Sequence, residues 1–382
     1  MGLKVPASSE ILTPLLEKCT ECGACISECA FLEKYGTPAE LAREFLLSED
    51  PDPLFPFECS LCGLCGTVCP EGLDPAAHFL DMRRMLIKDG RGIRPGHSPM
   101  MKHEERGTSR LLTFYALPEG CDTVFFPGCS LPGTRPDITL DTYRRLKKSD
   151  PALGIVLDCC CKPSHDLGRQ DHFLALFGEM RAWLLEHGVS AVLTACPNCY
   201  RVFADYGAPL RAESIYEVLA RTWERGAGPT GNVVTVHDSC AVRHDEHIHA
   251  AVRSLLRAAG CVPEEMVHSG KKTLCCGSGG FADLISPALA GRWAEMRQKE
   301  AGGRRLAMYC GACTKRFGSA AHVLDFLFDP EAAHAGKVKI AGPPWTYSNR
   351  IWLKRAFGKE VRPAVTRVRD FRVETDRVDS QS

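Results

Sequence analysis

The chain has 382 residues, of which 45% are hydrophobic and 25% charged, as expected for a globular protein of two or three domains. Lysine plus arginine and aspartate plus glutamate both total 47, so no basic field marks nucleic acid as a partner. The count that demands an explanation is 21 cysteines, an odd number that argues against a disulfide framework.

The start of the chain lacks the long apolar core of a signal peptide, and no apolar run approaches the roughly 18 residues that span a bilayer. We therefore expect a cytoplasmic protein, with any contact to the inner face of the membrane made through a partner subunit. In a reducing compartment, cysteine clusters bind metal or take part in catalysis.

Two cysteine runs with the spacing C-x2-C-x2-C-x3-C open the chain, within Lys18–Ala30 and Glu58–Pro70. Each places three cysteines on one tight loop, and soft, anionic thiolates suit iron. Gly23, Gly63 and Gly66 let the backbone turn closely around a bound group. Structural zinc sites are the alternative, but zinc motifs usually pair two separated C-x2-C hooks.

The two runs resemble those of bacterial two-cluster ferredoxins, in which the fourth cysteine of each run binds the other cluster. The resemblance implies two cubane 4Fe–4S clusters. One would be held by Cys19, Cys22, Cys25 and Cys69, and the other by Cys59, Cys62, Cys65 and Cys29. Helices are expected at Pro38–Ser48 and Pro75–Asp89, so residues 1–95 should form a helical ferredoxin-type module.

After a linker expected at 96–120, the sequence repeats itself. Matching cysteines are offset by 111 residues (Cys129 to Cys240), 116 (Cys160 to Cys276) and 114 (Cys196 to Cys310). Each cysteine group follows a short apolar run of strand character, and amphipathic stretches such as Asp171–His187 and Ala288–Glu300 have helical period.

Alternating strands and helices predict parallel sheets, whose strand ends bring distant cysteines to one edge. The predicted fold class is therefore α+β and α/β multidomain: the helical two-cluster module, then two duplicated α/β parallel-sheet cysteine-rich domains. Their expected bounds are 121–228 and 229–335, with a C-terminal tail at 336–382. Five thiolates in each repeat are too many for one cubane, and adjacent side chains point apart, so an opened or distorted cluster is expected.

The repeated pattern resembles the cysteine-rich (CCG) domain of heterodisulfide reductase. The resemblance rests on HDSCAVR (His237–Arg243), LCCGSGG (Leu274–Gly280) and CPNCYRVF (Cys196–Phe203). Ferredoxin motifs followed by two such domains look like the D-type component of the membrane-linked enzyme, over residues 15–320. This implies one or two non-cubane 4Fe–4S clusters that reduce a coenzyme or protein disulfide with single electrons from the ferredoxin-type clusters.

The resemblance also implies a ligand set for the two repeats: Cys129, Cys159, Cys160, Cys196 and Cys199 in the first, and Cys240, Cys275, Cys276, Cys310 and Cys313 in the second. The first repeat departs from the family by reading Cys159-Cys160-Cys161, followed by Lys162-Pro163. Alignment on the proline places Cys161 at the glycine position, and Cys160–Cys161 as the ligating pair is the alternative.

Iron–sulfur subunits of glycolate, lactate and glycerol-3-phosphate oxidoreductases share this plan, so an electron relay for a flavin-dependent dehydrogenase is the alternative function. No flavin or nicotinamide motif is present, and a partner must supply electrons. A cytochrome b-type membrane protein or a flavoprotein is expected in that role.

Several residues beside the clusters remain open to two interpretations. His165 and His237 could donate a proton to a departing thiolate, or they could cap helix starts or hydrogen-bond to cluster sulfurs. Cys121 and Cys261 lack partners at useful spacing and are expected in the core. The aromatic, basic tail from Pro343 could dock on a partner or pack on its own domain. No catalytic residue is singled out.

Overall fold

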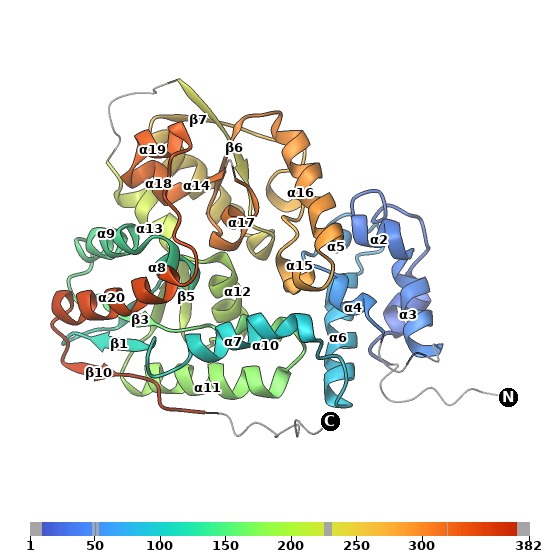
Figure 1. The fold of residues 1–382 in the computed structure, drawn as a ribbon, viewed down its shortest axis with the longest axis horizontal. Coiled ribbons are helices and arrows are strands. Elements are labelled where there is room, and N and C mark those ends of the chain that lie inside the picture. The colour runs from blue at the N-terminus through green and yellow to red at the C-terminus, as the bar shows by residue number, and fades with distance from the viewer. Residues whose placement is uncertain (1–9, 48–49, 51–52, 225–230, 319, 373–382) are drawn as a thin grey trace.

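A computed structural model describes residues 10–47, 50, 53–224, 231–318 and 320–372 of the chain (Figure 1). A helical front part is followed by a six-stranded and then a four-stranded sheet, each with flanking helices. The predicted fold class is confirmed. Among the helices of the described residues, none has the length and apolarity to cross a membrane.

The front part forms its own lobe of short helices, drawn in blue in Figure 1. Helix α6 begins where the Asp74 side chain accepts a hydrogen bond from the Ala77 amide, and Pro75 occupies its first turn. Helices α3 and α6 confirm the two predicted helices, although Ser48 lies outside the described residues. The helices are α1 Thr13–Lys18, α2 Ala30–Tyr35, α3 Pro38–Leu47, α4 Phe55–Glu58, α5 Leu64–Thr67 and α6 Pro75–Lys88.

The first sheet has the strand order β10-β1-β3-β2-β4-β5. Strands β3, β2, β4 and β5 are parallel, whereas β1 is antiparallel to both β3 and β10. Its strands are β1 Phe114–Leu117, β2 Thr123–Phe126, β3 Gly154–Leu157, β4 Ala191–Thr194, β5 Arg211–Ser214 and β10 Val365–Arg367. Its helices are α7 Ser98–Gly107, α8 Ser130–Thr134, α9 Pro136–Lys147, α10 Lys162–Asp166, α11 Gln170–Glu186, α12 Pro197–Tyr206 and α13 Ile215–Thr222.

The second sheet is fully parallel, with the order β7-β6-β8-β9. Its strands are β6 Asn232–His237, β7 Cys261–Glu264, β8 Arg305–Met308 and β9 Ala320–His322. Its α-helices are α14 Glu246–Ala258, α15 Ala282–Ile285, α16 Pro287–Ala301, α17 Gly311–Arg316, α18 Val323–Phe328 and α19 Pro330–Ala335. Short 3-10 turns are η2 Pro95–His97, η3 Cys240–Val242, η4 Gly270–Lys272 and η5 Gly279–Phe281. Helices α11 and α16 match the two amphipathic stretches predicted.

The two sheets repeat one topology. In the four parallel strands of each, the second strand in chain order lies outside the first, and the third lies on the other side of the first. The chain therefore reverses its winding direction beside the first strand, which is where open α/β sheets place their ligands. The duplication inferred from cysteine spacing is thus also present in the strand order.

Three segments differ from the sequence-based expectation. The strand-like run before Cys275 is not a strand, because Cys261–Glu264 already occupies the position beside β6, with Asn232 opposite Cys261. Residues 96–120, expected as a linker, include α7 and β1. In the expected tail, α20 Trp345–Glu360 and β10 both join the first sheet region, and Phe357 packs edge-on against Tyr143 with ring centroids 5.2 Å apart.

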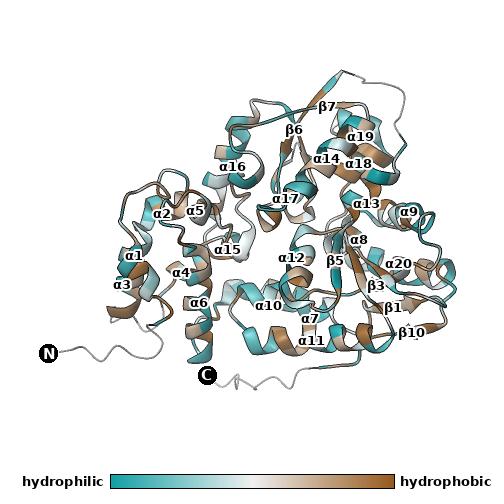
Figure 2. Ribbon diagram, turned by 180° about the vertical axis from the view of Figure 1, so that it is seen from behind, coloured by the Kyte–Doolittle hydropathy of each residue, from teal (hydrophilic) through white to brown (hydrophobic). Residues whose placement is uncertain are grey.

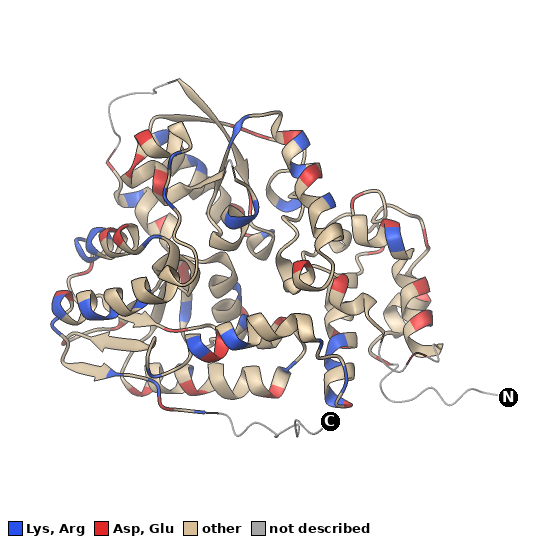
Figure 3. Cartoon of the chain, viewed as in Figure 1, with Lys and Arg blue, Asp and Glu red and all other residues tan. Residues whose placement is uncertain are grey.

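The two sheet regions share a continuous core. One cluster of buried apolar side chains includes Phe125 and Tyr216 from the first region and Val234 and Tyr309 from the second. In Figure 2 the strands are mainly brown, and teal is common on the helices around them. Lys and Arg lie interspersed with Asp and Glu over all parts of the chain in Figure 3, as expected for zero net charge.

Two buried arginines connect the parts of the molecule. Arg83 of α6 donates to four backbone carbonyls, and its side chain is fully buried. The acceptors are Pro56 O (2.8 Å), Asp166 O (2.6 Å), Gly280 O (2.9 Å) and Cys59 O (2.5 Å). Arg135 binds Asp325 through two contacts of 2.6 and 2.9 Å, joining the two sheet regions.

Candidate iron–sulfur sites

The two front cysteine loops have the same backbone conformation. The second residue after each leading cysteine, Glu21 or Leu61, lies in the left-handed region with φ of 54° or 52°. Gly23 and Gly63 follow at φ of 77° and 73°. This repeated turn wraps three thiols around one space, as the spacing predicts. At Gly66, a Cβ would lie only 3.1 Å from the Leu73 carbonyl oxygen.

The fourth cysteine of each run lies with the other run. Burial is the main cause that raises the pKa of Cys25 to about 11, and neighbouring thiols raise it further: those of Cys19, Cys22 and Cys69. Burial likewise raises the pKa of Cys65 well above its usual value, with contributions from Cys62, Cys59 and Cys29. These neighbours are the two sets expected from the ferredoxin resemblance.

The state and the surroundings of the front thiols fit a bound iron–sulfur cluster. All 21 cysteines, which lie in the described residues, are free thiols. Burying several thiolates together is unfavourable unless a metal compensates their charge. One hollow in this lobe is lined by cysteines of both runs: Cys19, Cys22, Cys25, Cys65 and Cys69.

The first cysteine-rich site lies at the carboxyl ends of β2, β3 and β4. Cys129 follows β2, Cys159 to Cys161 follow β3, and Cys196 begins α12. The Sγ atoms of Cys160 and Cys199 are 3.4 Å apart. Gly128, at φ 75°, lets the end of β2 approach the Cys196–Cys199 segment closely. A Cβ at this position would lie only 3.1 Å from the Cys199 sulfur. On the other side, a hydrogen bond with Cys159 lowers the pKa of Cys129 well below its usual value.

The second site repeats this arrangement. Cys240 follows β6, Cys310 begins α17, and the Sγ atoms of Cys276 and Cys313 are 3.2 Å apart. His237, at the end of β6, is buried, and its ring nitrogen lies within 4.8 Å of the Cys276 and Cys313 sulfurs. Burial lowers the pKa of this histidine. His237 therefore faces the thiols, a placement that suits both proton donation to a thiolate and a hydrogen bond to a cluster sulfur.

The thiol contacts support the alignment on Pro163. Cys160 contacts Cys199, the second cysteine of the C-x2-C pair in its site. Cys276 makes the same contact with Cys313 in the other site. Cys159 then corresponds to Cys275, and Cys161 corresponds to Gly277. Cys161 and Gly277 both have left-handed backbones, with φ of 57° and 90°. The geometry thus favours Cys159–Cys160 over Cys160–Cys161 as the equivalent pair.

The cysteine groups adjoin one another in a fixed order. A hydrogen bond with Cys275 is the main cause that lowers the pKa of Cys62 to about 6, and Cys275 Sγ also lies 3.0 Å from Ser60 Oγ. Between the two sheet regions, a hydrogen bond with Cys196 lowers the pKa of Cys310, and the amide nitrogen of Asn198 lies 3.7 Å from the Cys310 sulfur. The second front run therefore contacts the second site, which contacts the first.

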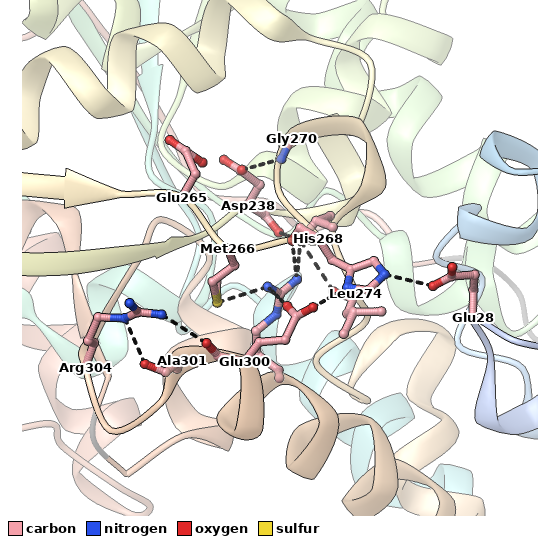
Figure 4. Close-up of polar contacts among 12 residues, drawn as sticks. Glu28, Asp238, Glu265, Met266, His268, Gly270, Leu274, Glu300, Ala301 and Arg304 are labelled. Atoms are coloured by element: carbon pink, nitrogen blue, oxygen red, sulfur yellow. Dashed lines mark hydrogen bonds and ion pairs between the residues drawn. The ribbon is translucent and has the colours of Figure 1, made fainter.

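Polar side chains hold these junctions in place. Arg243 donates to Cys62 O (3.0 Å) and Thr273 O (3.0 Å), linking the second front loop to the segment before Cys275. In Figure 4, His268 lies between Glu300 and Glu28, with a distance of 2.9 Å from Nε2 to the Glu28 carboxylate. Arg297 anchors the same segment by donating to the Thr273 hydroxyl (3.0 Å).

The remaining sequence candidates lie outside the thiol clusters. His165 contacts Asp166 (2.9 Å) and the Tyr206 hydroxyl (3.0 Å), so it supports α10. Cys121 and Cys261 are buried with apolar neighbours, and burial is the main cause that raises the pKa of each to about 11.

Sequence reasoning missed Glu104 and Arg350, which lie beside the first site from α7 and α20. Neither has a motif, and both are far from the cysteines in sequence. Arg243 belongs to the HDSCAVR motif, but cysteine spacing gives no signal for its contact with the front loop.

Comparisons with known proteins identify the parts of the chain. Residues 18–74 match the family of the 4Fe-4S dicluster domain, and residues 123–204 and 234–318 each match the cysteine-rich domain family. The D-type component of dihydromethanophenazine:CoB–CoM heterodisulfide reductase from Methanosarcina barkeri is 25% identical, over 78% of this chain and 86% of that protein. Its counterpart from Methanosarcina mazei is also 25% identical, over 75% of this chain and 83% of that protein.

A relative of another kind is the glycolate oxidase iron–sulfur subunit of Escherichia coli, which is 23% identical over 72% of this chain and 70% of that protein. The similarity to both kinds of protein indicates that this chain is an iron–sulfur protein that transfers electrons.

Proposed function

Since this chain is a heterodisulfide reductase D-like iron–sulfur protein, with a dicluster domain and two cysteine-rich domains, we propose that it reduces a disulfide. The observation that carries the proposal is the unbroken order of cysteine groups from the front lobe through the second site to the first. Both sites have five cysteines in equivalent positions, which is more than a relay requires.

The overall reaction consumes two electrons and two protons and converts one disulfide into two thiols. Iron–sulfur clusters bound at these cysteines would supply single electrons. The chain itself fixes the order of the groups: Arg243 ties the Cys62 loop to the Cys275 segment, and Arg83 ties Cys59 to both sheet regions. Both members of the adjacent cysteine pair are buried at each site.

Charged side chains of the chain suit anionic groups at the second site. Burial is the main cause that raises the pKa of Cys240 to about 12, and the positive charges of Arg243 and Lys162 offset part of this rise. The Nδ1 atom of His237 has no hydrogen-bond partner among the described residues. The His237 ring lies beside Cys276 and Cys313, where it can bond to a sulfur group held at this site.

The proposal includes a partner subunit, either a cytochrome b-type membrane protein or a flavoprotein, that delivers electrons at the front lobe. Cys22 is exposed there, so the first front run reaches the surface. A cytochrome b-type partner would bring the chain to the inner face of a membrane. The cysteine ligand sets and the domain bounds 121–228 and 229–335 are part of the same proposal.

The direct test uses anaerobically purified full-length protein reduced with dithionite and freed of excess reductant. Addition of a coenzyme-type or protein disulfide should reoxidise the clusters, seen as recovery of visible absorbance, and release two thiols per disulfide. The matching thiol alone is the control. Clusters that stay reduced with every disulfide tested, yet pass electrons to a dye, would contradict the proposal.

The similarity to the glycolate oxidase iron–sulfur subunit favours a second candidate, an electron relay for a flavin-dependent dehydrogenase. A relay would show rapid cluster reduction by a flavoprotein partner and no thiol release. The same reoxidation experiment therefore separates the two functions.

A further inference from the structure

The two cysteine-rich sites differ at one backbone position. Gly277 follows the cysteine pair of the second site, where a Cβ would lie 2.6 Å from the Ala290 carbonyl oxygen. Cys161 occupies the matching position in the first site, fully buried and with a left-handed backbone at φ 57°. A side chain in this conformation is strained, and such strain persists where the surroundings hold the residue for a purpose.

The Cys161 side chain lies in a group of metal-binding atoms. Its sulfur, the Cys159 sulfur and a carboxylate oxygen of Glu104 all lie within 4.8 Å of one another, and all three residues are buried. Glu104 comes from α7, outside the matched cysteine-rich segments. The Ser164 amide (2.9 Å) and hydroxyl both donate to this carboxylate and fix its orientation. Each carboxylate oxygen has a further lone pair for a metal.

A buried arginine independently points to an anionic group at this site. Arg350 of α20 is 3% exposed, and its Nη1 atom has no hydrogen-bond partner among the described residues. A Cβ on Gly107 would lie 3.4 Å from the Cys159 Cβ and 3.7 Å from Arg350 Nη1, so the guanidinium lies beside Cys159. A buried, unpaired guanidinium N–H is unfavourable without a negatively charged acceptor. Metal-bound thiolates and sulfides supply such an acceptor.

We propose that Cys161 and Glu104 are metal ligands of the first cysteine-rich site, binding iron beside Cys159 in addition to the five equivalent cysteines. In this site Cys129 and Cys161 both adjoin Cys159, the thiol that lies with Glu104. Cys160 instead contacts Cys199, and Cys196 adjoins Cys310 of the second site. Iron accepts both thiolate and carboxylate ligands. This inference rests on the proposed function, because it requires iron at the cysteine-rich sites.

The test compares full-length variants by iron content and Mössbauer spectroscopy after anaerobic purification. Cys161→Gly gives the first site the residue that the second site has, at a backbone angle that favours glycine, so it should fold. Glu104→Gln keeps the size of the side chain and removes the anionic oxygen. Cys121→Ala is the matched control, because Cys121 is a buried cysteine of the same domain outside the thiol clusters.

We expect Cys161→Gly to lose at least one iron per chain or to shift one iron subspectrum, and Glu104→Gln to shift the same subspectrum. Cys121→Ala should match the wild-type protein. Wild-type iron content and spectra in Cys161→Gly would overturn the inference while leaving the proposed function intact. A wild-type protein with no iron beyond its dicluster domain would overturn both.

Discussion

The sulfur of Cys160 lies 3.4 Å from the sulfur of Cys199, and Cys276 and Cys313 form the same contact, at 3.2 Å, in the second repeat. Because each pair lies inside its own sheet region, we expect Cys160→Ser to remove the metal signal of the first site only. Cys276→Ser should remove that of the second. Electron paramagnetic resonance of each variant, with iron quantified per chain, shows whether each substitution affects one site only. Loss of both signals from either single substitution would contradict two independent sites.

The crossed arrangement of the front cysteines makes a further prediction. Cys69 lies with Cys19, Cys22 and Cys25, so Cys69→Ala should perturb the cluster of the first run. Cys29→Ala should perturb the cluster of the second run, since Cys29 lies with Cys59 and Cys62. The two clusters can be told apart by their response to Ser60→Ala, which alters the surroundings of the second run. If Cys69→Ala perturbed only the cluster of the second run, and Cys29→Ala only that of the first, the fourth cysteines would not be exchanged between the two clusters.

Arg83 should be among the most sensitive residues of the fold. Its planar guanidinium reaches four buried carbonyls at once, which an alkyl ammonium cannot do. We expect Arg83→Ala to lower the free energy of unfolding by about 3–5 kcal/mol, since the carbonyls lose their donors. Chemical denaturation measures this loss. Arg84→Ala, on the same helix but with a partly exposed side chain, should change stability by less than about 1 kcal/mol.

The ion pair between Arg135 and Asp325 should show strong coupling. Both side chains are almost fully buried, so Asp325→Asn leaves an uncompensated guanidinium, and a loss of about 3–5 kcal/mol is expected. Replacement of both residues, Arg135→Met with Asp325→Leu, should recover part of this loss. Denaturation of the single variants Arg135→Met and Asp325→Leu and of the double variant gives the coupling energy. Additive losses would mean that the pair does not act as a unit.

Stability should depend on pH through His97. Burial, with nearby Arg83 and Arg94, lowers the pKa of His97 to about 4 from the ordinary 6.5. Its contribution is fully present above pH 6.5 and is lost as the pH falls towards 4, because the unfolded chain takes up the proton first. His97→Asn keeps an acceptor for the Arg94 amide and should flatten the stability profile below pH 6.5. The same loss of stability below pH 6.5 in His97→Asn as in the wild-type protein would contradict this role of His97.

The cysteine loops could be predicted from sequence because short spacings and glycines confine each loop to few conformations. The grouping of Cys69 with the first run followed from the ferredoxin pattern. The duplicated parallel sheets followed from strands that alternate with helices, whereas their strand order is known only from the structure. These features are local, or repeat at a regular offset.

Other features depend on contacts that sequence separation hides. A strand was expected directly before the Cys275–Cys276 pair, but the strand at this place in the sheet is β7, which begins at Cys261. The loop after β7 therefore differs from its counterpart after β3. Glu104 and Arg350 reach the first site only through the packing of α7 and α20. The three residues Val365–Arg367 are too few to signal a strand, and their pairing with β1 arises from the folded edge of the sheet.

Strand β10 leaves the ribosome last among the strands of the first sheet, about 250 residues after its partner β1. Until β10 is synthesised, this sheet therefore has an open edge at β1, and until α20 is synthesised the first cysteine-rich site lacks Arg350. The segments around the front loops, residues 13–88, are by contrast synthesised early. Iron delivery to the nascent chain can thus begin at the front lobe, whereas the first cysteine-rich site is completed only after α20 and β10 have been synthesised.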